Sequence, residues 1–215
     1  MRARPGSLRP GLSSRGSALI FGKKMNRYVT VTGLPASGKS TLARVLAKEL
    51  VLPLLDKDDF LESMFEGRTV GDLDARRKLS RAADRELRNR AEQSNGAIIT
   101  SWWKHPTSPA DSGTPTEWLA SLQGLVVEVY CECSPVIAAR RFVGRPRHPR
   151  HLDSRWSYPE LLADFTEHAS LGPLGVGRLV IAQTDREIEF SALTRAIEQA
   201  WEITEKPNQA SARTP

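Results

Sequence analysis

A glycine-rich stretch, Gly33-Leu34-Pro35-Ala36-Ser37-Gly38-Lys39-Ser40, constrains this chain more than any other feature. It follows an apolar run, residues 28–32, and it precedes residues 39–50, where leucine and valine recur at helical spacing. In the pattern Gly-x-x-x-x-Gly-Lys-Ser, the glycines let the backbone turn its N–H groups inward around phosphate oxygens. The dipole of the following helix favours the same anion. The sequence therefore predicts a strand, a phosphate-binding loop and a helix, in that order.

The loop predicts specific contacts with a bound nucleotide. Lys39 is expected to reach the outer phosphates, and Ser40 is expected to ligate a Mg²⁺ ion that bridges them. The expected nucleotide contacts within the loop and the first helical turn are Gly33, Ala36, Ser37, Gly38, Lys39, Ser40 and Thr41.

The rest of the chain alternates short apolar runs with amphipathic stretches. The expected strands are residues 28–32, 52–55, 97–100, 125–130 and 179–181. The expected helices are residues 39–50, 60–65, 73–95, a short one around Trp118, one opened by Pro135, 158–170 and 187–204. Such alternation predicts right-handed crossovers and a parallel sheet that helices cover on both faces. The expected fold class is therefore α/β, with three α/β/α layers and a five-stranded parallel sheet.

The charge of the chain is concentrated at its N-terminus. The formal net charge is +6, and residues 1–24 hold six basic residues and no acidic one. From Met25 onward the chain has 25 basic and 25 acidic residues, so this part is formally neutral. A nucleic-acid partner is therefore not expected, because it calls for a basic surface.

Composition also predicts the domain boundaries. Residues 1–24 are rich in Arg, Ser, Gly and Pro, and we expect a disordered basic tail there. This composition is loosely that of a transit peptide, but an extension ahead of a natural start at Met25 is favoured. The expected domain spans residues 25–205, and we expect residues 206–215 to be a second disordered tail. No apolar run approaches the ~20 residues of a membrane span, and two cysteines form no disulfide framework, so we expect a cytoplasmic protein of unknown oligomeric state.

Three carboxylates, in Asp56-Lys57-Asp58-Asp59, follow directly on the second expected strand. In a parallel sheet the carboxyl ends of the strands face the ligand crevice. An enzyme that transfers a phosphoryl group needs an acid there, to accept the proton of the attacking hydroxyl or to hold the metal ion. A plainer role is that Asp58 or Asp59 caps the helix expected at residues 60–65. Both roles can be present together.

A phosphate loop followed by Asp-x-Asp at the end of the second strand resembles small P-loop kinases. These include shikimate, gluconate and adenylylsulfate kinases, polynucleotide 5′-kinases, and zeta-toxin-like and chloramphenicol-phosphotransferase-like enzymes. The resemblance implies a P-loop NTPase fold and transfer of the γ-phosphoryl group of ATP to an alcohol hydroxyl of a small molecule, with Mg²⁺. It also implies that Asp56 lies at the metal ion and that Asp58 is the catalytic base. Asp59 is the alternative base, and both Asp58 and Asp59 are expected at the substrate.

An arginine-rich stretch, residues 139–151, resembles the lid that such kinases carry after the fourth strand. Arginine suits a lid because its planar guanidinium can donate two hydrogen bonds to phosphate. The resemblance implies that Arg141 and Arg145 act on the transferring group, whereas a solvated basic loop is the plainer alternative. The resemblance also implies that Arg140 lies near the adenine, beside the loop at residues 183–185, and we expect Arg147 at the substrate.

The lid stretch also contains Arg-His-Pro-x-His, with Gly172-Pro-Leu-Gly175 further along the chain. The combination resembles a bacterial group of AAA-type, P-loop kinase-like proteins over roughly residues 27–204, and it carries little information about the acceptor. His148 and His151 either orient the lid or stabilise it. A zinc site made of these histidines with Cys131 and Cys133 fits poorly, because structural zinc sites usually space their cysteines by two to four residues.

The end of the third expected strand gives two further hints. The strand ends at Thr100-Ser101, without the terminal Asp of a Walker B strand, which weakens a motor-ATPase or GTPase interpretation. Trp102 is expected to face the substrate pocket and Trp103 to pack in the core. Two rival functions stay open: a polynucleotide 5′-hydroxyl kinase and a non-catalytic ATP-binding regulatory module.

Overall fold

A computed structural model describes residues 25–65, 73–110, 112–144 and 156–205 of the chain. The strands are β1 (Asn26–Gly33), β2 (Leu54–Asp56), β3 (Gly96–Thr100), β4 (Gly124–Glu132) and β5 (Arg178–Gln183). The helices are α1 (Lys39–Glu49), α2 (Lys57–Phe65), α3 (Leu73–Gln93), α4 (Pro135–Gly144), α5 (Tyr158–Leu171), α6 (Phe190–Glu205) and the short 3₁₀ helix η1 (Glu117–Ser121). The two predicted tails, residues 1–24 and 206–215, lie outside the described residues.

The five strands form one parallel sheet in the order β2-β3-β1-β4-β5. The predicted α/β fold is thereby confirmed. Strand β1 lies in the middle of the sheet, hydrogen-bonded to β3 on one side and to β4 on the other. The loop that leaves its carboxyl end is therefore surrounded by the ends of neighbouring strands.

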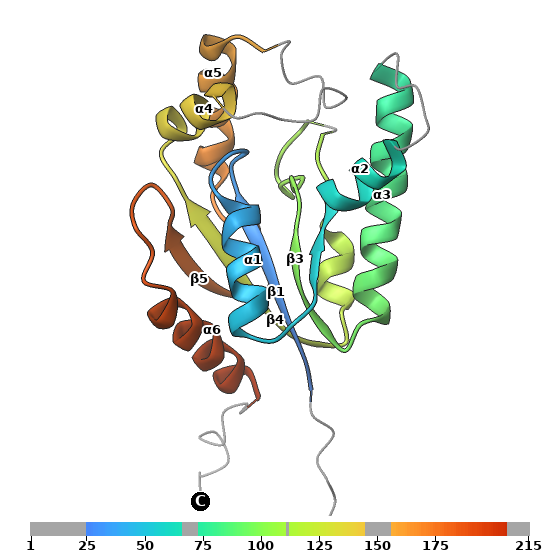
Figure 1. Cartoon of the computed structure of the whole chain (residues 1–215), viewed down its shortest axis with the longest axis vertical. Helices are drawn as coiled ribbons and strands as arrows, with labels where there is room; N and C mark the ends of the chain where they lie inside the picture. The colour runs from blue at the N-terminus through green and yellow to red at the C-terminus, as the bar shows by residue number, and fades with distance from the viewer. Residues whose placement is uncertain (1–24, 66–72, 111, 145–155, 206–215) are drawn as a thin grey trace, which may run out of the picture.

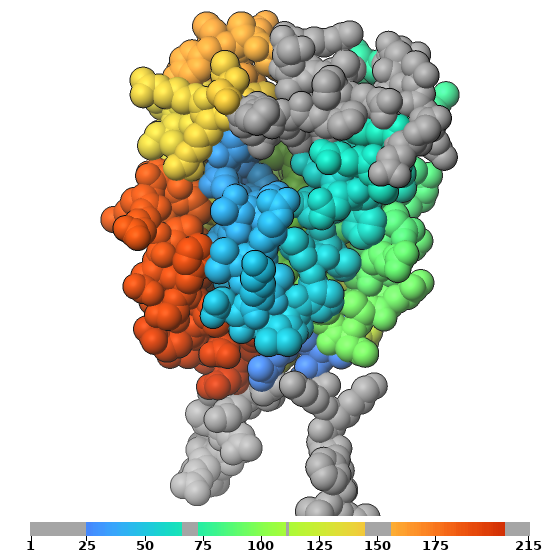
Figure 2. Space-filling view, viewed as in Figure 1, coloured from blue at the N-terminus to red at the C-terminus, as the bar shows by residue number. Residues whose placement is uncertain are grey.

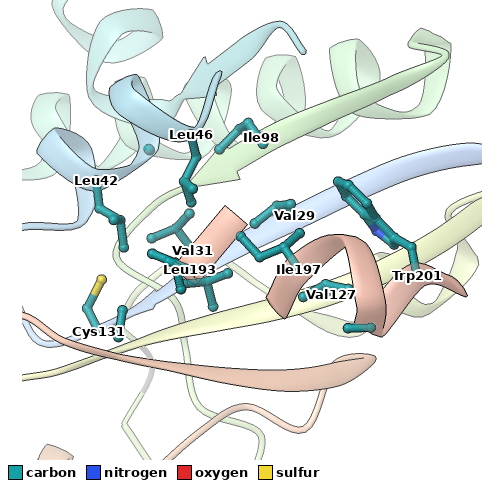
Figure 3. Packing of buried hydrophobic residues seen from close by; sticks show 14 of the residues in the cluster. Val29, Val31, Leu42, Leu46, Ile98, Val127, Cys131, Leu193, Ile197 and Trp201 are labelled. Carbon is teal, nitrogen blue, oxygen red and sulfur yellow. The ribbon is translucent and has the colours of Figure 1, made fainter. Parts of the chain in front are cut away.

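One face of the sheet is covered by α1 and α6 (Figure 1). Leu42 and Leu46 of α1 and Ile197 and Trp201 of α6 pack on Val29 and on other side chains of the strands (Figure 3). The space-filling view shows α1 at the surface between α6 and α2 (Figure 2). This packing fixes the direction of α1, and so the position of the phosphate loop at its N-terminal end.

The other face of the sheet is covered by α3 and η1. Leu87 of α3 and Leu119 of η1 are fully buried in this cluster, together with Tyr28 and Ile99 of the strands. Helices α4 and α5 lie beyond the carboxyl edge of the sheet, where they pack on Leu34 of the phosphate loop. The phosphate loop therefore lies between the pair α4–α5 and the pair α2–α3 (Figure 1).

Helix α2 begins three residues earlier than expected, at Lys57 instead of Phe60. The carboxylate of Asp56, the residue before the helix, accepts a hydrogen bond of 3.1 Å from the backbone N–H of Asp58. Asp56 thus serves as the N-cap. The expectation that Asp58 or Asp59 caps this helix is wrong, because both lie inside its first turn. Among the described helices, none is long and apolar enough to cross a membrane.

Candidate active site

The phosphate loop connects β1 to α1 and takes backbone conformations that its sequence makes possible. Gly33 and Gly38 have φ angles of 125° and 97°, in a region that L side chains rarely adopt. A Cβ atom on Gly33 would lie 2.6 Å from the carbonyl oxygen of Cys131 in β4, so this position has no room for a side chain. Gly38 is the N-cap of α1 and supplies no capping side chain, which leaves the first N–H groups of the helix to an external acceptor.

Lys39 lies across the loop that precedes it. The side chain is buried, and its Nζ donates to the carbonyl oxygens of Gly33, at 2.9 Å, and of Leu34, at 2.6 Å. The same ammonium lies 6.0 Å from the ring centroid of Trp102. These contacts hold a positive charge at the mouth of the loop, where the outer phosphates of a nucleotide would meet it.

The Ser40 hydroxyl and the Asp56 carboxylate are hydrogen-bonded to each other below the phosphate loop. Asp56 is only 4% exposed, and its burial raises the pKa of the carboxyl above its usual value, although the hydrogen bonds from Ser40 and from the Asp58 N–H oppose this shift. The negative charge of Asp56 is therefore costly in the protein alone and calls for a cation.

The hydroxyl of Thr100 supplies a further oxygen next to the Ser40–Asp56 pair. Asp56 pairs with Thr100 in the register of β2 and β3. The side chain of Thr100 lies on the same face of the sheet as that of Ile98, two residues earlier, which packs in the cluster beneath α1. Its Oγ1 is buried without a hydrogen-bond partner among the residues described. Hydroxyl and carboxylate oxygens suit a hard cation such as Mg²⁺, so Ser40, Asp56 and Thr100 form a fitting donor set.

The two other carboxylates of the motif, Asp58 and Asp59, differ in their exposure to solvent. Asp58 is half-buried in the first turn of α2, whereas Asp59 is exposed. Lys57 lies between Asp56 and Asp58 in the chain, and its side chain is directed toward α3. Its Nζ forms a buried ion pair of 2.6 Å with Asp84 of α3 and donates to Thr114 Oγ1 at 3.1 Å. This ion pair ties α2 to α3 and fixes the turn that carries Asp58.

Arg141 links α4 to the loop after β5. Its Nη1 donates to the carbonyl oxygen of Thr184 at 2.9 Å. The side chain of Thr184 in turn lies next to Gly38 of the phosphate loop, where an added Cβ would be 3.9 Å away. Arg140 is exposed on the same helix. The remaining lid residues of the sequence prediction, Arg145, Arg147, His148 and His151, lie outside the described residues.

The two cysteines are buried at the end of β4. Burial raises the pKa of Cys131 to about 12, and it also raises the pKa of Cys133. Zinc binds the thiolate form, which this environment disfavours. Among the described residues no group of three or more His, Cys, Asp or Glu side chains is placed to hold a metal ion.

The two tryptophans after β3 have separate roles. Trp103 is 5% exposed; it packs against Trp118 and donates from Nε1 to the carbonyl oxygen of Val31 at 2.9 Å. Trp102 is half-buried and forms part of the wall of a pocket beside the phosphate loop. The pocket is lined by Thr32, Gly33, Leu34, Trp102, Trp103, His105, Tyr130, His168, Leu171, Gly172 and Leu174.

Glu128 shapes this pocket from below, and the sequence analysis did not single it out. The side chain is fully buried in β4. Its carboxylate accepts hydrogen bonds from the backbone N–H groups of Leu174, Gly175 and Val176, at 2.7, 2.9 and 3.2 Å, and from the Thr32 hydroxyl at 2.8 Å. One buried carboxylate thus holds the loop after α5 against the end of β1. The one signal in the sequence was a single charged residue within the apolar run of β4.

Comparisons with known proteins agree with this architecture. Residues 29–156, more than half of the chain, match a family described as AAA domain. A search of curated proteins finds none that matches significantly. Among solved structures, the chain resembles a candidate kinase from Chloroflexus aurantiacus J-10-fl, with a TM-score of 0.66, 24% identity, and coverage of 86% of this chain and 100% of that one.

Two shikimate kinases also share the fold. The enzyme from Bacteroides thetaiotaomicron has a TM-score of 0.52 at 20% identity, over 84% of this chain and 99% of its own. The enzyme from Acinetobacter baumannii, solved in complex with shikimate, has a TM-score of 0.55 at 17% identity, over 86% and 97%. At these identities the likeness concerns the fold, and the site residues have to be argued from their own geometry.

Proposed function

Since the chain belongs to the AAA-domain family that residues 29–156 match, we propose that it is a kinase which transfers the γ-phosphoryl group of ATP to a hydroxyl of a small molecule. The observation that carries the proposal is the grouping at the carboxyl edge of the sheet. Lys39, the Ser40–Asp56 pair and Asp58 come from three separate elements and meet at this edge. A protein that only bound nucleotide would need the first two and not an additional half-buried carboxylate.

Each group has a separate task in this reaction. The backbone N–H groups of the loop and the Lys39 ammonium hold the β- and γ-phosphates. Ser40 and Asp56, with Thr100 nearby, would hold Mg²⁺, which would neutralise charge on the phosphate oxygens. The carboxylate of Asp58 accepts the proton of the attacking hydroxyl as the new O–P bond forms and the bond to the ADP oxygen breaks. Arg141 stabilises charge on the transferring group from the side of α4.

The test is the formation of ADP and of a phosphorylated product from Mg²⁺·ATP in the presence of a panel of hydroxylated small molecules. The proposal expects ADP formation that depends on one acceptor class and is lost in Lys39→Ala, a variant whose circular dichroism matches the wild type. Binding of ATP without turnover on any acceptor would overturn the proposal, and so would equal turnover in Lys39→Ala. A 5′-hydroxyl oligonucleotide in the panel tests the polynucleotide kinase alternative directly.

A further inference from the structure

The pocket beside the phosphate loop adjoins the lysine that, in the proposed reaction, holds the outer phosphates. Two of its lining residues, Gly33 and Leu34, are the ones whose carbonyl oxygens hold the Lys39 ammonium. Trp102 lines the same pocket, with its ring 6.0 Å from that ammonium. A molecule seated against Trp102 therefore has one end close to the lysine that grips the outer phosphates.

The described wall presents no cationic side chain to an acceptor, and the one carboxylate directly behind it is that of Glu128, which accepts hydrogen bonds from Thr32 and Leu174 of the wall. The lining residues of the pocket include no Asp, Glu, Lys or Arg, and its polar side chains are those of Thr32, His105, Tyr130 and His168 together with the indoles. A carboxylate or phosphate on the far side of an acceptor would lose its hydration there without gaining a counter-charge from this wall, which costs free energy. A neutral acceptor avoids this cost.

His105 uses both of its ring nitrogens within the protein. Its Nδ1 accepts from the backbone N–H of Thr107 at 3.2 Å, so the proton of the neutral ring is on Nε2, which donates to the carbonyl oxygen of Pro173 at 3.0 Å. This bond ties the loop after β3 to the loop after α5. His105 therefore builds the pocket and has no ring nitrogen to offer a ligand.

His168 is different, because one of its nitrogens remains available. Its Nδ1 donates to the backbone carbonyl oxygen of Asp164 at 2.8 Å and lies 3.4 Å from the carboxylate oxygen of the same residue, and both acceptors place the proton of the neutral ring on Nδ1. Nε2 then carries a lone pair, and it has no hydrogen-bond partner within the part of the chain that the structure describes. The imidazole lies 4.8 Å from the Trp102 ring, centroid to centroid.

From this geometry we infer that the acceptor is a neutral ring carrying several hydroxyl groups, of the sugar or cyclitol class. Its apolar face lies on Trp102, since an indole offers a large flat surface with little conformational freedom to lose. One hydroxyl is directed to Lys39 and Asp58 and receives the phosphoryl group, and its proton passes to Asp58 while ADP leaves. A second hydroxyl donates to Nε2 of His168, which selects acceptors that carry a hydroxyl at that distance. The inference rests on the proposed kinase activity for the first hydroxyl only.

The experiment compares neutral polyhydroxylated rings with the same rings bearing a carboxylate, such as glucose with glucuronate and galactose with galacturonate, and it adds inositol as a neutral cyclitol. ADP formation gives kcat and KM, and calorimetry with ADP and Mg²⁺ present gives acceptor binding without turnover. We expect binding and turnover for at least one neutral ring and at least tenfold poorer values for its carboxylate analogue. Preference for the carboxylate forms, or no binding of any neutral ring, would overturn the inference.

Two variants test the role of His168. His168→Leu should raise the KM or Kd of the neutral acceptor by about tenfold, the value of one lost hydrogen bond, and leave the KM of ATP unchanged. His168→Gln retains an acceptor atom near the position of Nε2 and should recover part of this loss. Ser170→Ala, on the exposed side of the same helix, is the matched control and should change neither constant.

The outcomes separate the inference from the proposed function. In one outcome, neutral rings bind to the wild type, bind more weakly to His168→Leu, and are never phosphorylated. This outcome would support the pocket assignment and contradict the proposed kinase activity. Phosphorylation with no change in KM for His168→Leu would support the kinase and contradict the role of His168.

Discussion

A hydrogen bond joins Ser40, in the first turn of α1, to Asp56, at the end of β2. Burial nevertheless raises the pKa of the Asp56 carboxyl above its usual value. The same carboxylate caps α2 through the N–H of Asp58. One side chain thus connects the phosphate loop, the expected metal position and the helix that carries the expected base. The predictions below concern this arrangement, the buried Glu128 of β4 and Arg141 of α4.

Asp56→Asn should stabilise the protein measured without ligands at neutral pH. The raised pKa means that the folded state favours the protonated carboxyl, so the stability that Asp56 contributes is present at low pH and is lost as the pH rises through the folded-state pKa. Asn keeps one acceptor oxygen for the Asp58 N–H, its NH2 group can donate to the Ser40 hydroxyl oxygen, and it carries no charge. The melting temperature of the variant should therefore exceed that of the wild type at pH 7, and the difference should vanish below about pH 4, the ordinary Asp value.

With Mg²⁺·ATP present, the melting temperature of the wild type should exceed that of Asp56→Asn. Ligand binding raises the melting temperature of the wild type by mass action, and the variant, lacking the carboxylate, should gain less. Asp59→Asn, which removes an exposed charge from the same turn, is the control. Equal stabilisation of Asp56→Asn and wild type by Mg²⁺·ATP would contradict the assignment of Asp56 to the metal position.

Glu128→Gln should destabilise the domain and loosen the acceptor pocket. The amide keeps one acceptor oxygen but puts an NH2 donor in place of the other, so it faces either the N–H of Leu174 or the N–H groups of Gly175 and Val176 with a donor. Leaving such buried groups unsatisfied costs about 1–3 kcal/mol, and each kcal/mol lowers the melting temperature of a domain this size by roughly 2–4 °C.

Because Leu174 lines the pocket, the KM of the acceptor should rise in Glu128→Gln more than the KM of ATP. Thermal melting and steady-state kinetics on the same preparation check both parts. An unchanged melting temperature would mean that Glu128 does not hold this loop.

Much of the fold could be predicted from the sequence, because the signals were local. The pattern Gly-x-x-x-x-Gly-Lys-Ser between an apolar run and a helix fixed the phosphate loop, and alternating apolar and amphipathic stretches predicted the parallel sheet that the structure has. The start of α2 was missed because an aspartate at the end of a strand can also be an N-cap. The sequence pattern does not say which of three nearby carboxylates accepts the helix N–H groups.

The pocket could not be predicted, because its parts are distant in sequence. Glu128 binds N–H groups 46 to 48 residues away, and backbone donors leave no trace in residue type. His168 belongs to a helix that the sequence presents only as an amphipathic cover, and its neighbour Trp102 lies on a different element. The sequence analysis expected Trp102 at the pocket and Trp103 in the core, but the contact of Trp102 with Lys39 could be seen only in the folded chain.

Arg141→Lys should lower turnover by about tenfold and change the KM of ATP much less. Lysine keeps the charge but lacks the planar guanidinium that can donate to phosphate oxygens and to the Thr184 carbonyl together. Arg44→Lys, at an exposed position on α1, is the control for the same chemical change. A rise in the KM of ATP with unchanged kcat would show that Arg141 binds the nucleotide and takes no part in transfer.

The central claim, that Asp58 is the base of a phosphoryl transfer, is tested most directly by comparing Asp58→Asn with Asp59→Asn. Both residues lie in the first turn of α2, and Asp56 caps that helix, so neither substitution removes the cap. A general base contributes roughly 10²–10⁴-fold to the rate, whereas we expect ATP binding to depend on Lys39 and the loop backbone. Product formation with a single acceptor and titration with ATP should be measured on both variants. We predict that Asp58→Asn binds ATP like the wild type and loses transfer by at least about a hundredfold, while Asp59→Asn keeps most of its activity; full activity in Asp58→Asn, or loss in Asp59→Asn alone, would contradict this account.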